Sequence, residues 1–251
     1  MRAFFSPIAD ALLYPLDHDI VRARLAAEGI DEVWTLPYAH KPGVAVGLNE
    51  AARDAAARPG PVTVIPGATV HPADDDAVGI VRHATDELGC RVLKLHCSVG
   101  DFEADDPRLD AVWAQVSRVR LPVVVHVGHG TNGQTEGAEL APIERVALRH
   151  PGAVIIIAHC AHPAVDAALD LVERYAGVHA DLTPVLTEPS AVPHDRLAVV
   201  AHKLLFGSDA PNTGVAAGDT LRTIRSFPVT PEAVRAITGD TARRLLADVR
   251  R

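Results

Sequence analysis

Four apolar segments of this sequence each contain or end in a residue that can bind a metal ion, transfer a proton or carry a charge. The segments are 92–96, 123–126, 154–159 and 204–209, and the residues are Lys94, His126, His159 and Asp209. An apolar run of this length between Pro or Gly residues predicts a strand that is buried on both faces. Parallel α/β barrels keep their chemistry at the C-terminal ends of such strands. These four side chains are therefore expected to share one site.

His126 and Asp209 have the chemistry of metal ligands. A neutral imidazole and a carboxylate both bind Zn²⁺, and a catalytic zinc site takes about three protein ligands and a water molecule. Small residues follow His126 in the sequence Val127-Gly128-His129-Gly130, which lets a loop pass close to a ligand. The alternatives are a structural histidine at 126 and, for Asp209, the N-cap of the next helix. As a catalytic group, Asp209 would also accept a proton from metal-bound water.

His159 and Lys94 allow several roles. His159 would bind a metal ion, or polarise the substrate or bound water as an acid or base. Lys94 would contact an anionic substrate, form a structural ion pair or, when carbamylated, bridge two metal ions. His96, His71 and His129 are the further candidates for contact with the substrate. Together with Arg91, His40 and Lys41 they are expected at the same mouth, where basic groups suit a carboxylate-bearing substrate.

Seven segments have the pattern of strands, and helical patterns separate them. The strands are expected at 32–36, 62–69, 91–95, 122–126, 153–159, 178–182 and 203–208. The helices are expected at 17–28, 48–57, 74–87, 109–119, 142–148, 164–175 and 231–246. This alternation predicts parallel strands with right-handed crossovers. We therefore expect a (β/α)₈ TIM-type barrel in one domain over residues 1–251. Residues 1–14 are the only place for its first strand, so the first βα unit is expected to be missing or degenerate.

Composition excludes several classes of protein. The chain has 251 residues and a net charge of −8 without a basic block, which argues against binding to nucleic acid. No apolar run approaches the roughly 20 residues of a membrane span, and no signal peptide is visible. The sequence also lacks GxSxG and P-loop motifs. The three cysteines are expected to be reduced thiols of a cytoplasmic protein.

The candidate residues lie in motifs that resemble the amidohydrolase superfamily. The motifs are Ala68-Thr69-Val70-His71-Pro72, Lys94-Leu95-His96, Val125-His126-Val127-Gly128, Ile157-Ala158-His159-Cys160 and Phe206-Gly207-Ser208-Asp209-Ala210-Pro211. The resemblance is strongest to the amidohydrolase-related branch, which includes aminocarboxymuconate-semialdehyde decarboxylase-like enzymes. It implies that His126 binds a divalent metal ion, most simply Zn²⁺. It also implies that His159 is the catalytic or second-metal histidine, and that Asp209 is a ligand and general base.

The sequence departs from this family pattern in one respect. The family takes two further ligands from a His-x-His pair on its first strand, and none of the 13 histidines forms such a pair. Either the chain begins too late, or it is a degenerate member, or other residues replace the pair. An incomplete site of this kind is expected to hold metal weakly, and an unpaired strand edge is expected to promote association.

The sequence therefore predicts a metal-dependent hydrolase that acts on an amide or ester-like bond of a small molecule. One alternative uses the same site for non-oxidative decarboxylation of a small unsaturated acid. Another is a catalytically inactive barrel that binds a ligand or a partner subunit. The expected partner is a small molecule, with a homo-oligomer as a possible assembly.

Overall fold

The computed structural model describes residues 13–15, 17–127, 137–183 and 193–250. All strand pairings among them are parallel. The strands are β1 Glu32–Trp34, β2 Thr63–Ile65, β3 Gly67–Thr69, β4 Val92–Leu95, β5 Pro122–Val125, β6 Val154–Ile157, β7 Val178–Asp181 and β8 Leu204–Leu205. One sheet has the order β1-β2 and the other runs from β3 to β8 in sequence order. This order is that of a parallel barrel in which each strand pairs with the next.

The sequence predicts one strand at 62–69, but the structure divides it at Pro66 into β2 and β3. Proline has no backbone N–H, so it cannot donate to a strand ladder. The Thr35 hydroxyl accepts a hydrogen bond from the Gly67 N–H at 3.0 Å, just beyond this break. A Cβ atom on Gly67 would lie only 1.9 Å from the Thr35 carbonyl oxygen, so this close approach requires glycine.

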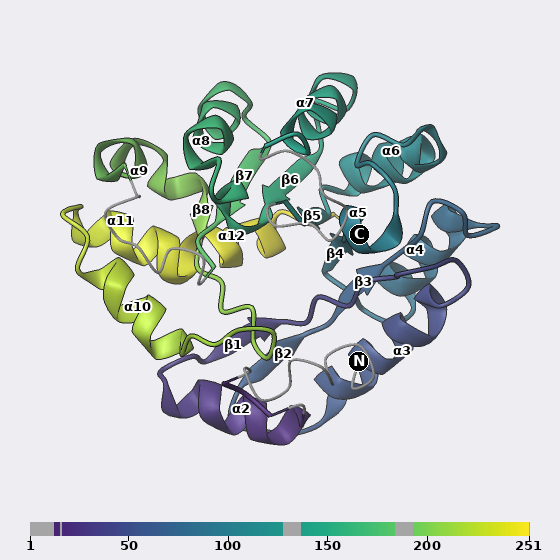
Figure 1. The fold of residues 1–251 in the computed structure, drawn as a ribbon. Helices are drawn as coiled ribbons and strands as arrows, with labels where there is room; N and C mark the ends of the chain where they lie inside the picture. The colour runs from purple at the N-terminus through teal and green to yellow at the C-terminus, as the bar shows by residue number, and fades with distance from the viewer. Residues whose placement is uncertain (1–12, 16, 128–136, 184–192, 251) are drawn as a thin grey trace.

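Helices surround the strands, as Figure 1 shows. The described helices that follow the strands or precede the first one are α2 His18–Ala27, α3 Ala45–Ala57, α4 Ala77–Asp86, α6 Asp110–Val119, α7 Leu140–Arg149, α8 Val165–Arg174, α9 His194–Val200 and α10 Ala217–Arg225. Side-chain N-caps fix two of these starts: Asp17 begins α2 and Asp76 begins α4. The Asp76 carboxylate accepts a hydrogen bond from the Gly79 N–H in the first turn of α4.

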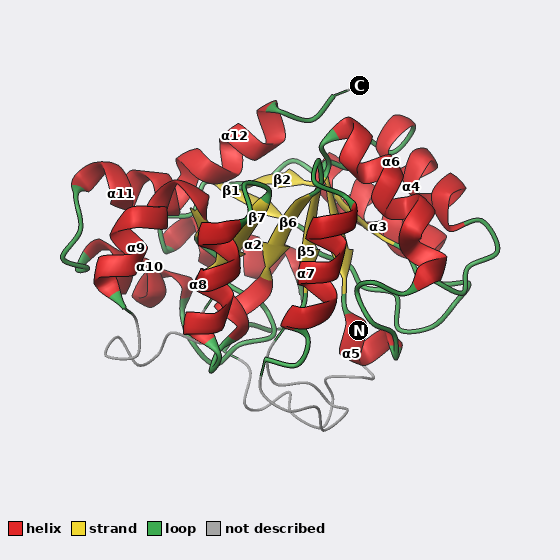
Figure 2. Ribbon diagram, turned by 90° about the horizontal axis from the view of Figure 1, so that it is seen from above, coloured by secondary structure: helices red, strands yellow, loops and turns green. Residues whose placement is uncertain are grey.

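The core has an outer and an inner part. The outer part packs the helices against the strands and includes Leu93, Val123 and Ile155. The inner part fills the barrel with Val92, Val124, Val154, Ile156, Ala158, Leu205 and, from α12 Thr241–Ala247, Leu245. Figure 2 shows α12 across one end of the strands and the short helix α5 Cys97–Gly100 at the other. Helix α12 therefore closes the N-terminal end of the barrel, and the strands open toward α5.

The TIM-type α/β fold predicted from the sequence is confirmed. All seven expected strands are present, although the structure gives them shorter bounds. The expected first strand falls almost wholly within residues 1–12, which lie outside the described residues. The predicted helix 231–246 is wrong as a single element. It is divided into α11 Pro231–Arg235, the π-helical segment η6 Ala236–Asp240 and α12, with a kink at Gly239. Among the described helices, none is long and apolar enough to cross a membrane.

Candidate active site at the C-terminal end of the barrel

Lys94 points into the barrel. Side chains alternate along a strand, so Lys94 shares a face with Val92, which belongs to the inner core. Its backbone pairs with Val124 of β5, another inner residue. Only 6% of the Lys94 side chain is exposed, and burial lowers its pKa. The negative charges of Asp181 and Asp209 oppose this shift, so both carboxyl groups act on the buried ammonium group.

Three histidines from successive strand ends lie against one another. The rings of His96 and His126 are stacked, with centroids 3.8 Å apart and planes at 19°. His126 meets His159 edge to face at 5.0 Å, and His126 Nδ1 lies 3.3 Å from His159 Nε2. The ring of Tyr38, from the loop after β1, packs on His96 at 4.9 Å. The C-terminal end of the barrel therefore presents a continuous set of aromatic ring faces.

His159 is held in a strained but well-supported position. It begins a run of three residues with positive φ, at 58° for His159, 44° for Cys160 and 52° for Ala161. This left-handed conformation costs roughly 1–2 kcal/mol per residue outside glycine. The Asp181 carboxylate accepts hydrogen bonds from the backbone N–H groups of His159 at 3.0 Å and Thr183 at 3.2 Å. The Thr183 hydroxyl contacts His159 Nδ1, so the ring as well as the backbone is fixed.

The Asp209 carboxyl group is protonated more readily than an ordinary aspartic acid. Burial is the main cause, and the negative charge of Asp181 adds to it, while Lys94 and a hydrogen bond from Asn212 act in the opposite direction. The net effect raises the pKa of Asp209 to about 6. Asp209 also raises the pKa of Tyr38, after the larger effect of burial. Asp209 therefore acts electrostatically on Tyr38, whose ring packs on His96.

The neighbouring imidazoles are kept neutral. Burial, followed by the charges of Lys94 and His159, lowers the pKa of His96 to about 3. Burial also lowers the pKa of His159, even though Asp181 favours its protonated form. Neutral imidazoles offer lone pairs to a metal ion or accept a proton from a substrate. The site therefore combines two imidazoles whose protonated forms are disfavoured, His96 and His159, with the buried Lys94 amine and two carboxyl groups.

The described residues fit part of a metal centre. Two nitrogens bound to one tetrahedral Zn²⁺ lie about 3.3 Å apart when each bond is about 2.0 Å. The separation of 3.3 Å between His126 Nδ1 and His159 Nε2 matches that value. However, no three His, Cys, Asp or Glu side chains form a metal-binding group within the described ranges. Two imidazoles alone do not complete a catalytic metal site.

The structure brings Lys94, His96, His126, His159 and Asp209 into one electrostatically coupled site, but it places two other residues differently. His71 accepts from the Ala73 N–H with Nδ1 and contacts the Gly100 carbonyl with Nε2, so it braces the C-terminal end of α5. The expectation that Arg91 lines the mouth is wrong. Arg91 precedes β4 and donates to the Leu246 carbonyl of α12, at the opposite end of the barrel. His129 lies outside the described residues.

Sequence reasoning missed Asp181, Thr183 and Tyr38. The signal for Asp181 was present, because the β7 sequence Val178-His179-Ala180-Asp181 alternates apolar and polar residues and ends in a carboxylate. Polar residues at alternate positions of a strand with four buried residues must point into the barrel, where they need partners. Tyr38 and Thr183 lie in loops, and no periodic pattern marks them.

Solved structures of similar fold come from several proteins. An uncharacterized TIM-barrel protein from Bordetella bronchiseptica has a TM-score of 0.79 at 20% identity, over 91% of this chain and 82% of its own. A 2,6-dihydroxybenzoate decarboxylase complexed with 2,6-dihydroxybenzoate has a TM-score of 0.74 at 15% identity, over 98% and 93%. A dihydroxybenzoic acid decarboxylase from Polaromonas sp. JS666, with bound manganese and 2-nitroresorcinol, has a TM-score of 0.68 at 14% identity, over 97% and 90%.

The family assignment comes from the sequence itself. No curated protein sequence matches this chain. The sequence profile of the family described as Amidohydrolase, however, matches residues 10–247, which is nearly the whole chain. The match includes every described strand and each of the strand-end residues in the site. This chain therefore belongs to the amidohydrolase family.

Proposed function

We propose that this protein is an enzyme that removes CO₂ from a small, planar, unsaturated carboxylic acid without oxidation. The observation that carries the proposal is the position of buried Lys94 beside the stacked rings of His96 and His126. A flat, conjugated acid combines an anionic group with an apolar face, and these two features match the ammonium group and the ring faces.

Lys94 would select the charged end of the substrate. A buried ammonium group interacts strongly with a carboxylate because the surrounding dielectric constant is low. Lys94 has no hydrogen bond from its Nζ atom within the described part of the chain, so its donors are available to a ligand. The ring faces of Tyr38 and His96 would hold the flat part of the substrate by offset or edge-to-face stacking.

The chemical step breaks the bond between the ring or vinyl carbon and the carboxylate carbon. The electron pair stays on the substrate carbon, CO₂ leaves, and one proton is added at that carbon. Asp209 is the proposed proton donor, since it is buried at a strand end and its pKa is raised to about 6. Asp181 and Thr183 would act on His159 as positioning groups.

We also propose that the site takes a divalent metal ion at His126 and His159, with Asp209 as the carboxylate ligand. The ion would act as a Lewis acid toward an oxygen of the substrate. Two observations support this proposal. The two imidazole nitrogens lie 3.3 Å apart, and the chain belongs to the amidohydrolase family, whose motifs imply these ligands. The manganese in one similar structure supports an ion other than Zn²⁺ as a candidate.

Hydrolysis of an amide or ester-like bond is the second candidate. The family description favours it, and the same histidines and Asp209 would serve water in place of a carbon acid. Several proteins of similar structure favour decarboxylation, since they are 2,6-dihydroxybenzoate and 5-carboxyvanillate decarboxylases. A planar ring surface in the site agrees with that class of substrate.

The test is an activity screen with and without added Mn²⁺ or Zn²⁺. CO₂ release is measured from 2,6-dihydroxybenzoate and other planar unsaturated acids, and hydrolysis is measured with aryl esters and anilides. Lys94→Met is the test variant, and Lys41→Met is its control because Lys41 is exposed. We expect Lys94→Met to raise KM for the acid at least about tenfold through the lost charge pair. If the protein hydrolyses esters but releases no CO₂ from any of the acids, the decarboxylase proposal is wrong and hydrolysis takes its place.

A further inference from the structure

A second cavity lies at the N-terminal end of the barrel, far along the strands from the candidate active site. It has a volume of about 400 Å³, whereas the cavity next to His126 has about 50 Å³. Arg120 precedes β5, Ala176 precedes β7, and His202 and Lys203 precede β8, so the lining comes from the starts of parallel strands. Arg244 of α12 completes it. The larger cavity is therefore separate from the residues proposed for catalysis.

The lining of this cavity is strongly cationic. Arg120, Arg174, Lys203 and Arg244 contribute four fixed positive charges, and Glu173 contributes the single negative charge. Three of these cations already have partners, and one of them, Arg244, uses only one of its donors, on the His202 carbonyl. Arg174 pairs with Glu144 at 2.7 Å, and Lys203 donates to the carbonyls of Val172 and Tyr175 at 2.6 and 2.9 Å. Glu173 pairs with Arg196 at 3.0 Å. The charges left for a ligand are those of Arg120 and Arg244.

Arg120 and Arg244 are placed for such a ligand. The Arg120 guanidinium makes no hydrogen bond or ion pair with any described residue. Its backbone has φ +55° at the end of α6, where glycine is the usual residue, so the chain holds an arginine at an unfavourable position. Arg244 is oriented by a hydrogen bond of 2.6 Å to the His202 carbonyl, which leaves its other donors free.

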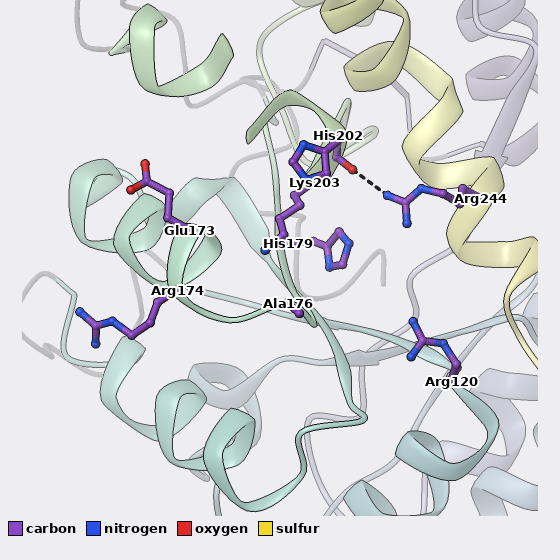
Figure 3. Close-up of a pocket in the computed structure, with 8 residues that line it drawn as sticks. All are labelled: Arg120, Glu173, Arg174, Ala176, His179, His202, Lys203 and Arg244. Carbon is purple, nitrogen blue, oxygen red and sulfur yellow. Dashed lines mark hydrogen bonds between the residues drawn. The ribbon is translucent and has the colours of Figure 1, made fainter. Parts of the chain in front are cut away.

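His179 supplies a buried polar group between these two arginines. Its side chain is 4% exposed, and its Nδ1 contacts the Gly177 carbonyl at 3.1 Å. Its Nε2 has no hydrogen-bond partner in the described ranges. Figure 3 shows the ring directed toward the space between the guanidinium groups of Arg120 and Arg244, whereas Glu173 and Arg174 extend away from it. The residue as a whole is buried, and its Nε2 atom is left accessible to the cavity that His179 lines.

We propose that Arg120, His179 and Arg244 form a binding site for a small, multiply charged oxyanion, such as a phosphate group or a polycarboxylate. Guanidinium groups donate paired hydrogen bonds to such groups, and these bonds are strong because both partners are charged. The cavity is large enough for a metabolite that carries the anionic group. Nothing in the proposed decarboxylation uses these residues, so the site would be a second one.

Binding of an anion should be linked to protonation of His179. Burial lowers the pKa of His179 to about 4, and the charges of Arg244, Lys203 and His202 add to that effect. Arg120 and Arg174 also belong to the lining of the cavity, and Glu173 is its only opposing charge. An oxyanion beside Nε2 would offset this positive potential and accept a hydrogen bond from a protonated ring. The pKa of His179 should therefore rise when the anion is bound.

The test uses inorganic phosphate as the probe. Calorimetric titration at pH 7.5, with chloride at equal ionic strength as the reference, gives the affinity for the full chain and for two variants. Arg120→Gln removes a guanidinium without a partner. Arg174→Gln is the matched control, since Arg174 is also part of the cavity lining but its guanidinium extends away and pairs with Glu144. We expect Arg120→Gln to weaken phosphate binding about tenfold or more, and Arg174→Gln to change it less than about twofold.

A second measurement follows the His179 imidazole by NMR during a pH titration, with His179→Asn used to assign the signal. We expect phosphate to shift its pKa upward, and to do so far less in Arg120→Gln. Equal losses of affinity in Arg120→Gln and Arg174→Gln would indicate general attraction to a basic surface and overturn the proposal. Absence of phosphate binding, or a pKa of His179 that phosphate leaves unchanged, would overturn it as well. Both measurements are independent of catalytic activity.

Discussion

The two ends of this barrel bury ionisable groups in opposite ways, and strand β7 contributes to both. Asp181, near the C-terminal end, is 8% exposed and accepts hydrogen bonds from two backbone N–H groups. His179, two residues earlier on the same inward face, is 4% exposed and has a partner at only one ring nitrogen. Similar burial is therefore used differently: Asp181 holds backbone groups of the neighbouring segment, whereas His179 leaves one ring nitrogen for a ligand.

This difference separates support from binding. Asp181 accepts the backbone N–H groups of His159 and Thr183 with its Oδ1 atom, so it fixes the position of a catalytic candidate. His179 lies in a cavity of about 400 Å³ with guanidinium groups on both sides, so its open nitrogen faces space for a ligand. The comparison predicts that variants at one end change turnover and that variants at the other end change anion affinity.

The largest effect should come from Asp209→Asn. This change keeps the shape of the side chain but removes its negative charge and its ability to transfer a proton. We expect turnover of the acid substrate to fall at least about 100-fold, in line with the loss of a general acid or base. Phosphate affinity at the other end should stay within about twofold, because none of its proposed ligands changes. A variant with turnover near that of the parent chain would remove Asp209 from the mechanism.

The second effect concerns Gly207, which leaves room for Thr183. A Cβ atom on Gly207 would lie 2.2 Å from Thr183 Cγ2 and 3.3 Å from Asp181 Oδ1. Gly207→Ala should therefore displace Thr183 and lower the free energy of unfolding by about 1–3 kcal/mol, as overpacking usually does. Chemical denaturation measures this change. Gly47→Ala in α3 is the control, because nothing lies within 4 Å of a Cβ atom there. Equal stability of Gly207→Ala and the parent chain would contradict the close packing.

Much of the fold was predictable because the strands that surround a barrel interior are buried on both faces. Segments such as 122–126 and 153–159 are continuous apolar runs, and their ends marked His126 and His159. The site residues that were missed depend on the register of neighbouring strands and on loops. Asp181 gains its role from the His159 backbone, 22 residues away in sequence. The Arg91 error arose because an arginine beside a strand does not reveal which end of the strand it serves.

The third effect should be smaller and specific to the ring of His159. Thr183→Val keeps the side-chain volume but removes the hydroxyl that contacts His159 Nδ1. We expect kcat to fall about tenfold with little change in KM, since the substrate does not contact Thr183 in this proposal. Thr183→Ser should restore most of the loss, and a shifted pH profile of kcat would show that the His159 imidazole is affected. Loss of stability without these kinetic changes would assign Thr183 a purely structural role.

The smallest effect is a pH dependence of stability that arises from His179. The unfolded chain takes up a proton on this histidine near its ordinary pKa of 6.5, whereas the folded chain does so only near 4. Between these values the unfolded state binds more protons, so this contribution to stability falls as the pH decreases. We expect about 1 kcal/mol of it to be lost between pH 7.5 and pH 5.5. The comparison is between the parent chain and His179→Asn, with denaturation curves at both pH values and chloride as the only anion. The variant should lose less stability over this interval, and added phosphate should reduce the loss in the parent chain. Identical pH dependence in the two proteins would show that the positive potential at this end of the barrel does not act on His179.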